Sequence, residues 1–124
     1  MTSPKPPRNG PYREYYADGT IKKACRYRNG KLHGACKFYF NDGRLWAAGK
    51  FRDGKIHGPW TWNRKTGGRM ATGSFIDGKQ HGLWKRYQKN GKLMDEGRWK
   101  DGKKTGAWKI YDKAGKVRQT KTFK

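Results

Sequence analysis

The feature that most constrains this chain is a 24-residue period that runs without insertion or deletion. Glycine recurs at that interval from residue 10 to residue 106, and a second glycine follows each of these nine residues later. Aromatic side chains keep the same spacing, at Tyr27, Phe51, Phe75, Trp99 and Phe123. A fixed period of this length is typical of stacked supersecondary units. The sequence therefore predicts a repeat array that spans nearly the whole chain.

Each unit carries two turn signals. One series is Asp18-Gly19, Asp42-Gly43 and Asn90-Gly91, weakened to Thr66-Gly67 and Ala114-Gly115; the other is Asn29-Gly30, Asp53-Gly54, Asp77-Gly78 and Asp101-Gly102. These dipeptides suit type I′ hairpin turns because both central residues need positive φ. Between the turns lie 9 to 11 residues, enough for one strand. We expect an all-β fold, an elongated single-layer antiparallel meander of about ten strands built from 24-residue hairpin repeats.

The turns divide the chain into a short arm and an array. Residues 1–9 contain three of the five prolines together with basic residues, and we expect them to form a flexible arm. The array covers residues 10–124, with units 10–33, 34–57, 58–81 and 82–105 and a partial unit 106–124.

The fourth unit shows the repeat motif most clearly. It reads GLWKRY at residues 82–87, NGKL at 90–93 and EGRWKDGK at 96–103. This pattern resembles the MORN repeat, and most of all the bacterial variant found in antitoxin-annotated proteins. The resemblance implies an elongated sheet of hairpins with a role in scaffolding, protein contacts or binding of anionic lipid. The chain departs from the pattern at Cys25, where later units have glycine, and at Asn63, Arg69 and Gln80 in the third unit.

The net charge of the chain is far beyond what solubility needs. Lys and Arg number 31 against 9 Asp and Glu, which gives a net charge of +22. An aromatic content of 15% argues against wholesale disorder. No apolar run reaches the ~20 residues of a membrane span, and no signal-peptide h-region follows Met1. We therefore expect an intracellular, cytoplasmic protein.

Pairing residues symmetrically about the second turn of each unit assigns them to two faces of the sheet. About Asp53-Gly54, Phe51 faces Ile56, and alternation places the glycines and large aromatic residues on one side, the aromatic face. The glycines there leave space for a neighbouring tryptophan or bend the sheet. An exposed apolar patch on this face predicts a protein interface. Its residues are Trp60, Trp84, Trp99 and Trp108.

The opposite side, the basic face, carries most of the cations. Three cross-strand pairs at the second turns are like-charged, an arrangement that destabilises a sheet: Arg28/Lys31, Arg52/Lys55 and Lys100/Lys103. Such unmatched cations favour a polyanion-binding surface, with interleaved tyrosines for base stacking. The candidate residues are Arg26, Arg28, Lys31, Lys37, Lys50, Arg52, Lys55, Lys79, Lys85, Arg98, Lys100, Lys103 and Lys109, with Tyr39, Tyr87 and Tyr111.

The sequence indicates no enzyme, metal or cofactor site. His33, His57 and His81 recur at the repeat interval, but two strands per unit separate them by about 9–10 Å, too far to share a zinc ion. We expect a structural or anion-contacting role for them. No serine adjoins a histidine, and the adjacent acids Asp95 and Glu96 point to opposite faces of a strand, so no catalytic arrangement is formed.

The two cysteines are the only ones in the chain. Symmetric pairing about Asn29-Gly30 places Cys25 opposite Gly34 and therefore diagonal to Cys36. A disulfide between diagonal positions would be strained. Free thiols are the favoured prediction.

Three kinds of partner follow from these features. The first is nucleic acid or another polyanion, bound with low sequence specificity because no base-reading helix is indicated. The second is an acidic partner protein or a homo-oligomer, bound by an antitoxin-like module or assembly scaffold through the aromatic face. Anionic lipid ranks last because no amphipathic or insertion segment accompanies the charge.

Overall fold

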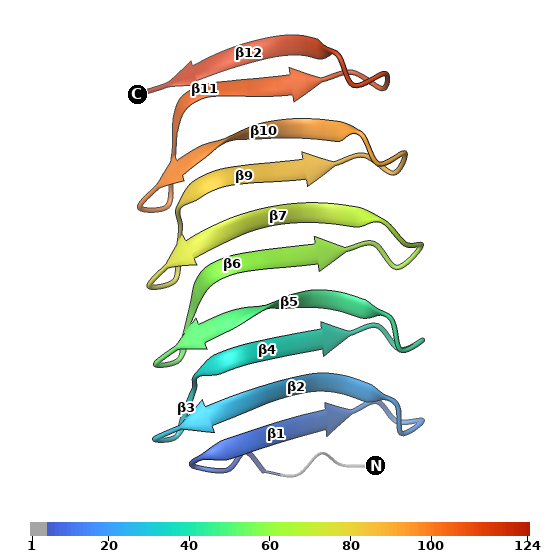
Figure 1. Ribbon diagram of the computed structural model, residues 1–124, viewed down its shortest axis with the longest axis vertical. Coiled ribbons are helices and arrows are strands. Elements are labelled where there is room, and N and C mark those ends of the chain that lie inside the picture. Colours follow the sequence, from blue (N-terminus) through green and yellow to red (C-terminus); the bar gives the residue numbers. More distant parts are fainter. Residues whose placement is uncertain (1–4) are drawn as a thin grey trace.

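The computed structural model describes residues 5–124, and within them the chain forms one antiparallel sheet and no helix (Figure 1). Ten main strands pair in chain order. They are β1 Gly10–Tyr15, β2 Ile21–Arg28, β4 Gly34–Tyr39, β5 Leu45–Arg52, β6 Lys55–Asn63, β7 Arg69–Ile76, β9 Gly82–Tyr87, β10 Leu93–Lys100, β11 Lys103–Tyr111 and β12 Val117–Phe123. The two-residue strands β3 (Lys31–Leu32) and β8 (Lys79–Gln80) pair with β2 and β7. The predicted single-layer meander is confirmed.

The two ends of the described chain lie at opposite ends of the stack, with β1 and β12 as the free edges (Figure 1). In residues 5–124 no helix has the length and apolar character needed to cross a membrane.

The second turn series has the predicted type I′ geometry. Asn29, Asp53, Asp77 and Asp101 have φ of 52°, 49°, 48° and 51°, and each is followed by a glycine that also has positive φ. Each turn is also bonded to the preceding unit, since the Gly54 N–H donates to the Leu32 carbonyl at 2.8 Å. The second turns of successive units are therefore held in a line at one end of the strands. This line of second turns is the turn edge of the sheet.

The first turn series differs from the prediction. Only its glycines have positive φ, as at Gly19 (φ 92°), and the Gly19 N–H donates to the Tyr16 carbonyl at 2.9 Å. The Tyr16 N–H in turn donates to the Thr20 carbonyl at 2.8 Å, which closes a three-residue loop with a glycine bulge. The Asp18 carboxylate accepts from the Thr20 N–H at 2.9 Å, which favours this loop over a type I′ turn.

The pairing register is regular near each second turn and then shifts. Phe51 opposes Ile56 as predicted, but farther from the turn a bulge around Gly58 (φ 74°) moves the pairing of β5 and β6 by two residues. An even shift leaves every side chain on its predicted face. Symmetry about the turn predicts that Gly49 pairs with Gly58 and Ala47 with Trp60. The bulge overturns both pairs, because Ala47 opposes Trp62.

Each bulge seats a tryptophan flat against a glycine of the neighbouring strand. A Cβ added to Gly49, Gly73 or Gly97 would lie 2.2, 2.2 or 2.1 Å from an indole atom. The three glycine–tryptophan pairs are Gly49/Trp60, Gly73/Trp84 and Gly97/Trp108. The indole Nε1 of Trp60 donates to the Lys50 carbonyl at 3.0 Å, which fixes the ring in place. The predicted space for a tryptophan is confirmed.

This packing corrects the predicted exposure of the aromatic face. Trp60 and Trp108 are only 2% and 6% exposed, while Trp84 and Trp99 are half-buried. Neighbouring rings cover the flat indoles, with Phe51 5.5 Å from Trp60 at 88° between planes. In a one-layer sheet these side chains form the core, so Trp60 and Trp108 present little surface to a partner.

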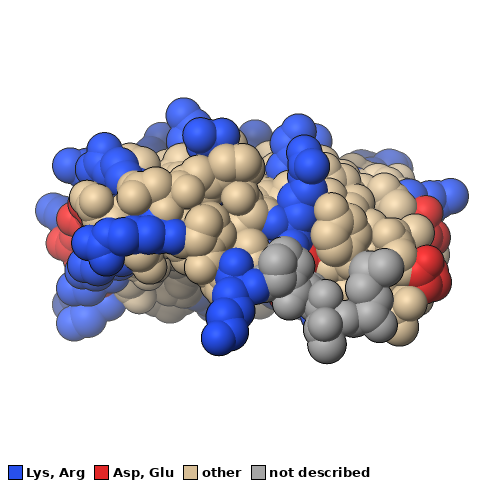
Figure 2. Space-filling view, turned by 90° about the horizontal axis from the view of Figure 1, so that it is seen from below, with Lys and Arg blue, Asp and Glu red and all other residues tan. Residues whose placement is uncertain are grey.

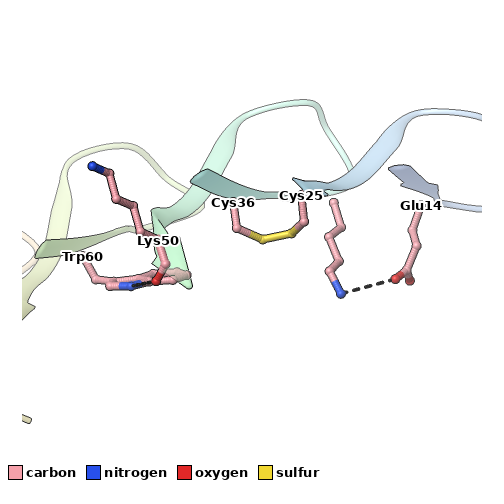
Figure 3. The surroundings of a disulfide bond; sticks show 6 residues. Glu14, Cys25, Cys36, Lys50 and Trp60 are labelled. Atoms are coloured by element: carbon pink, nitrogen blue, oxygen red, sulfur yellow. Dashed lines mark hydrogen bonds and ion pairs between the residues drawn. A yellow bond between two sulfur atoms is a disulfide. The ribbon is translucent and has the colours of Figure 1, made fainter. Parts of the chain in front are cut away.

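In the first hairpin a disulfide takes the place of the glycine–tryptophan pair. Cys25 and Cys36 are bonded, with Cα atoms 4.2 Å apart, and they are 4% and 1% exposed. Figure 3 shows the bridge on the same side of the sheet as Trp60. The prediction of free thiols is wrong. The bulge shifts the register so that Lys23 opposes Phe38, which brings Cys25 opposite Cys36 instead of Gly34.

Part of the predicted flexible arm is bound to the array. The carbonyl of Arg8 accepts from the Gly30 N–H at 2.8 Å, and Asn9 Oδ1 accepts from the Asn29 N–H at 3.0 Å. These bonds repeat the turn-to-unit contacts found along the array, while the flexibility of residues 1–9 stays a prediction. Residues 1–4 of the arm lie outside the described residues.

Candidate polyanion-binding face

Cations of the basic face stand at repeated register positions, most of them opposite uncharged residues, whereas Lys85 and Lys109 both oppose Glu96. Arg26 opposes Pro11, and Lys50 opposes Ala35. A second row of cations lies two residues farther along the strands, at the next position on the same face. The exposed or half-buried members of the two rows are Arg26, Lys50 and Arg98, then Arg13, Lys37, Lys85 and Lys109. Sequence reasoning missed Arg13, which has the same register position as Lys37, Lys85 and Lys109.

Acidic groups are sparse on the surface seen along the stack. Viewed from the β1 end, Lys and Arg project from both sides of the sheet, and the visible Asp and Glu gather toward the ends of the strands (Figure 2). Figure 3 shows the Lys50 side chain on the opposite side of the sheet from Trp60 and the disulfide. Lys50 and Trp60 therefore lie on opposite faces, as alternation along the strands predicts, although cations also project from the aromatic side.

Strands β6 and β7 interrupt both rows of cations. At the register positions that hold cations elsewhere, β6 and β7 carry Pro59 opposite Ser74 and Thr61 opposite Thr72. The basic face consequently has an N-terminal cluster and a C-terminal cluster. Arg13, Arg26, Lys37 and Lys50 form the first, and Lys85, Arg98 and Lys109 form the second.

The predicted like-charged pairs at the second turns are present. Arg28 opposes Lys31, Arg52 opposes Lys55, and Lys100 opposes Lys103. The first pair is less unmatched than predicted, because Arg28 Nη2 lies 3.7 Å from Asp53 Oδ1 of the next turn. Within residues 5–124 the other two pairs make no ion pair with a carboxylate. They are the uncompensated cations of the turn edge.

Lysine stems are stacked along the turn edge. The stems of Lys31, Lys55 and Lys79 lie beside the turn glycines of the following unit, at Gly54, Gly78 and Gly102. Such packing holds the aliphatic part of each side chain while the ammonium remains in water. Positive charge therefore recurs once per unit along the turn edge, at intervals of about 9–10 Å.

The histidines connect consecutive turns. His33 Nδ1 accepts from the Asp53 N–H, and His57 Nδ1 accepts from the Asp77 N–H, each at 3.3 Å. This confirms the structural role predicted for the column, whereas His81 Nδ1 is buried without a partner among the described residues. Residues 5–124 contain no group of histidine, cysteine or acidic side chains that could hold a metal ion.

The tyrosines predicted for base stacking are half-buried. Each of them follows a lysine of its strand by two residues and so shares the basic face with it. The three pairs are Lys37/Tyr39, Lys85/Tyr87 and Lys109/Tyr111. The Tyr111 hydroxyl donates to the Glu96 carboxylate, which lies opposite Lys109. This bond raises the pKa of Tyr111 to about 12, with desolvation as the next cause.

Titration should show this bond directly. Because the folded pKa of Tyr111 lies above its ordinary value of 10.0, the bond contributes stability below about pH 10, and that contribution is lost as pH rises through about 12. Absorbance at 295 nm should show one tyrosine of the seven ionising last. Tyr111→Phe should remove that step, and Glu96→Gln should move it toward pH 10. A late step that persists in both variants would exclude the bond.

Two ion pairs lie unexpectedly on the aromatic face. Lys23 Nζ is 3.5 Å from Glu14 (Figure 3), and Arg86 Nη2 is 2.5 Å from Asp95. Sequence reasoning missed them as a group, although Arg86 stands at the repeat position of Phe38 and Trp62. A polar residue at a position that is aromatic in other units was the available signal.

The geometry defines a class of protein, a single-layer β-hairpin repeat scaffold. The chain belongs to the MORN repeat family. Residues 8–29, 80–101 and 104–124 match the MORN repeat variant, and residues 26–43, 48–59, 72–83 and 96–107 match the MORN repeat. At the level of the family this is a non-catalytic repeat module. No curated protein matches the chain.

Proposed function

We propose that this MORN repeat scaffold binds a polyanion, nucleic acid first, through its basic face. The observation that supports this most is the recurrence of exposed or half-buried cations at fixed register positions, of which Lys85 and Lys109 lie opposite a carboxylate and the other five lie opposite uncharged residues. A surface shaped only by solubility gains stability from alternating charges, whereas this one keeps like charges opposite each other at Arg52/Lys55 and Lys100/Lys103. Phosphates would relieve that repulsion.

The chemistry of these side chains favours contacts with backbone phosphate over base recognition. Long lysine and arginine side chains on a sheet bind phosphate oxygens and release counterions, which makes affinity steeply dependent on salt. The described residues include no helix that could enter a groove. Sequence preference should therefore be weak.

An acidic partner protein is the alternative, because carboxylates meet the same cations. Such a module would be antitoxin-like or an assembly scaffold. An aromatic-face interface is the less favoured route for it, since Trp60 and Trp108 are buried. Competition between an oligonucleotide and polyglutamate separates the two kinds of ligand. Anionic vesicles added to the same assay test the lipid alternative.

A fourfold charge variant tests the proposed face. Replacing Arg52, Lys55, Lys100 and Lys103 with glutamine should weaken binding of a labelled single-stranded oligonucleotide and flatten the salt slope by about 3, at about 0.7 for each phosphate that is no longer neutralised. The melting temperature of the free protein should rise because two like-charged pairs are removed. Fluorescence anisotropy and thermal unfolding measure the two effects.

The control removes the same charge at the other end of the strands. Lys65, Lys89, Lys113 and Lys116, all exposed near the first turns, are replaced with glutamine. This variant should retain most of the affinity. If both variants lose affinity equally, binding follows net charge alone and the basic face is not the site.

A further inference from the structure

A hollow of about 310 Å³ opens on the aromatic face of the fourth unit. Three indoles line it, from Trp84, Trp99 and Trp108. The remaining lining residues are polar or charged: Gln80, Arg86, Asp95 and Lys104. The hollow lies on the opposite face from the proposed polyanion site.

Each of the four polar residues stands at a repeat position that is apolar in at least two other units. Arg86 stands where Phe38 and Trp62 stand, and its cross-strand partner Asp95 stands where Ala47 and Ala71 stand. Gln80 and Lys104 occupy the position of Leu32 and Ile56. The first unit carries an ion pair of the opposite order at the positions of Arg86 and Asp95, formed by Glu14 and Lys23, so the pair alone does not mark a site. At the fourth unit Gln80 and Lys104 join the pair, and all four side chains line one cavity, which is the pattern expected of a functional site.

Earlier units show what fills this space when it is closed. The ring of Phe38 lies 6.2 Å from Trp60 with 35° between planes, and the ring of Trp62 lies 5.4 Å from Trp84 with 30° between planes. The corresponding neighbour of Trp108 is Arg86, which carries no ring. The hollow is therefore the place of a missing planar ring beside a flat indole.

The charges at the hollow select the kind of ring. Asp95 is 9% exposed and receives Arg86 Nε at 3.0 Å and Nη2 at 2.5 Å. Lys104 Nζ lies 4.7 Å from the centroid of Trp108 and 5.8 Å from that of Trp99. Asp95 offsets the charge of Arg86, so Lys104 leaves the lining with one net positive charge, which favours an anionic ligand over a cationic one. Gln80 and Asp95 offer hydrogen-bond partners to a polar ring edge.

We propose that this hollow binds a nucleotide. The base takes the place that the rings of Phe38 and Trp62 hold in units two and three, with its polar edge toward Gln80 and Asp95. The phosphate is held by Arg86 and Lys104. The base can come from a free mononucleotide or from an unpaired residue of a nucleic-acid strand, and the chemistry of recognition is the same.

The test uses the full chain and four probes: GMP, AMP, UMP and inorganic phosphate. Quenching of tryptophan fluorescence and calorimetry should show saturable binding of the purine nucleotides with Kd at or below about 1 mM. UMP should bind more weakly because its ring offers less stacking area, and phosphate alone should not compete at equal concentration. A short single-stranded oligonucleotide and its abasic counterpart form the second arm and distinguish a strand from a free nucleotide as the source.

A filled variant separates binding from folding. Arg86→Trp combined with Asp95→Ala copies the residues of the third unit, Trp62 and Ala71, so the sheet should melt at the same temperature or higher. It should lose nucleotide affinity at least tenfold. Lys89→Gln, an exposed change near the first turn of the same unit and outside both the hollow and the basic face, is the matched control and should leave Kd within about twofold.

Several results would overturn the site. One is equal competition by phosphate, which would make it an anion site only. Others are unchanged affinity in the filled variant, or no saturable response to either nucleotides or strands. The fourfold basic-face variant should still bind mononucleotide, so failure here and failure of the proposed function are distinguishable.

Discussion

Replacing Gly97 with alanine is expected to lower the free energy of unfolding by about 3 kcal/mol. The added Cβ would lie 2.1 Å from Cδ2 of Trp108. Displacing the indole toward the hollow beside it would break the hydrogen bond from its Nε1 to the Arg98 carbonyl at 3.1 Å and disturb its packing on the rings of Trp99 and Phe123, 5.8 and 6.2 Å away. Urea denaturation followed by circular dichroism measures the loss.

A double-mutant cycle isolates the clash from other effects of alanine. In a Trp108→Ala background the space above residue 97 is empty, so Gly97→Ala should cost close to nothing. Neighbouring units hold the array together in that background, since each unit packs mainly on its neighbours. An equal cost of Gly97→Ala with and without Trp108 would show that the tryptophan is not seated on the glycine.

Loss of the Cys25–Cys36 bridge should cost about 3 kcal/mol, the loop-closure value for a sequence separation of 11. Cys25→Ser with Cys36→Ser should show this loss in oxidising buffer and little further change on addition of reductant. The oxidised wild-type protein, once denatured, should expose no thiol to a thiol reagent. Two reactive thiols under those conditions would exclude the bridge.

The later units indicate a double substitution that should stabilise the first hairpin without a disulfide. Cys25→Gly with Cys36→Trp recreates the glycine–tryptophan pair found at Gly49/Trp60. This variant should recover much of the lost stability and should be insensitive to reductant. Greater instability than the double-serine variant would show that the first hairpin cannot accept the packing of the later ones.

The period and the turn dipeptides were enough to predict the sheet and its two faces. Alternation along a strand is a parity rule, so a register shift of two residues at Gly58 leaves the sidedness of Lys50 and Trp60 unchanged. The shift itself was not predictable from symmetry about the turn. It changes which residues oppose each other, and for that reason the Cys25–Cys36 bridge was missed.

The limits on predicting the candidate site have a similar physical origin. Alternation along each strand was enough to assign cations to the basic face. The gap in the rows of cations at β6 and β7 is seen only when register positions are aligned across strands. Burial of Trp60 could not be predicted because a one-layer sheet was expected to leave its aromatic face uncovered. Rings of Phe38 and Phe51 cover it instead.

Lysine footprinting tests the proposed basic-face function most directly. The protein is acetylated briefly with and without a saturating single-stranded oligonucleotide, and the modified positions are quantified by mass spectrometry. Lys37, Lys50, Lys85 and Lys109 should be protected, whereas Lys113 and Lys116 at a first turn should react equally in both samples. Uniform protection of all six, or protection confined to Lys104 and Lys121 of the aromatic face, would contradict binding through the basic face.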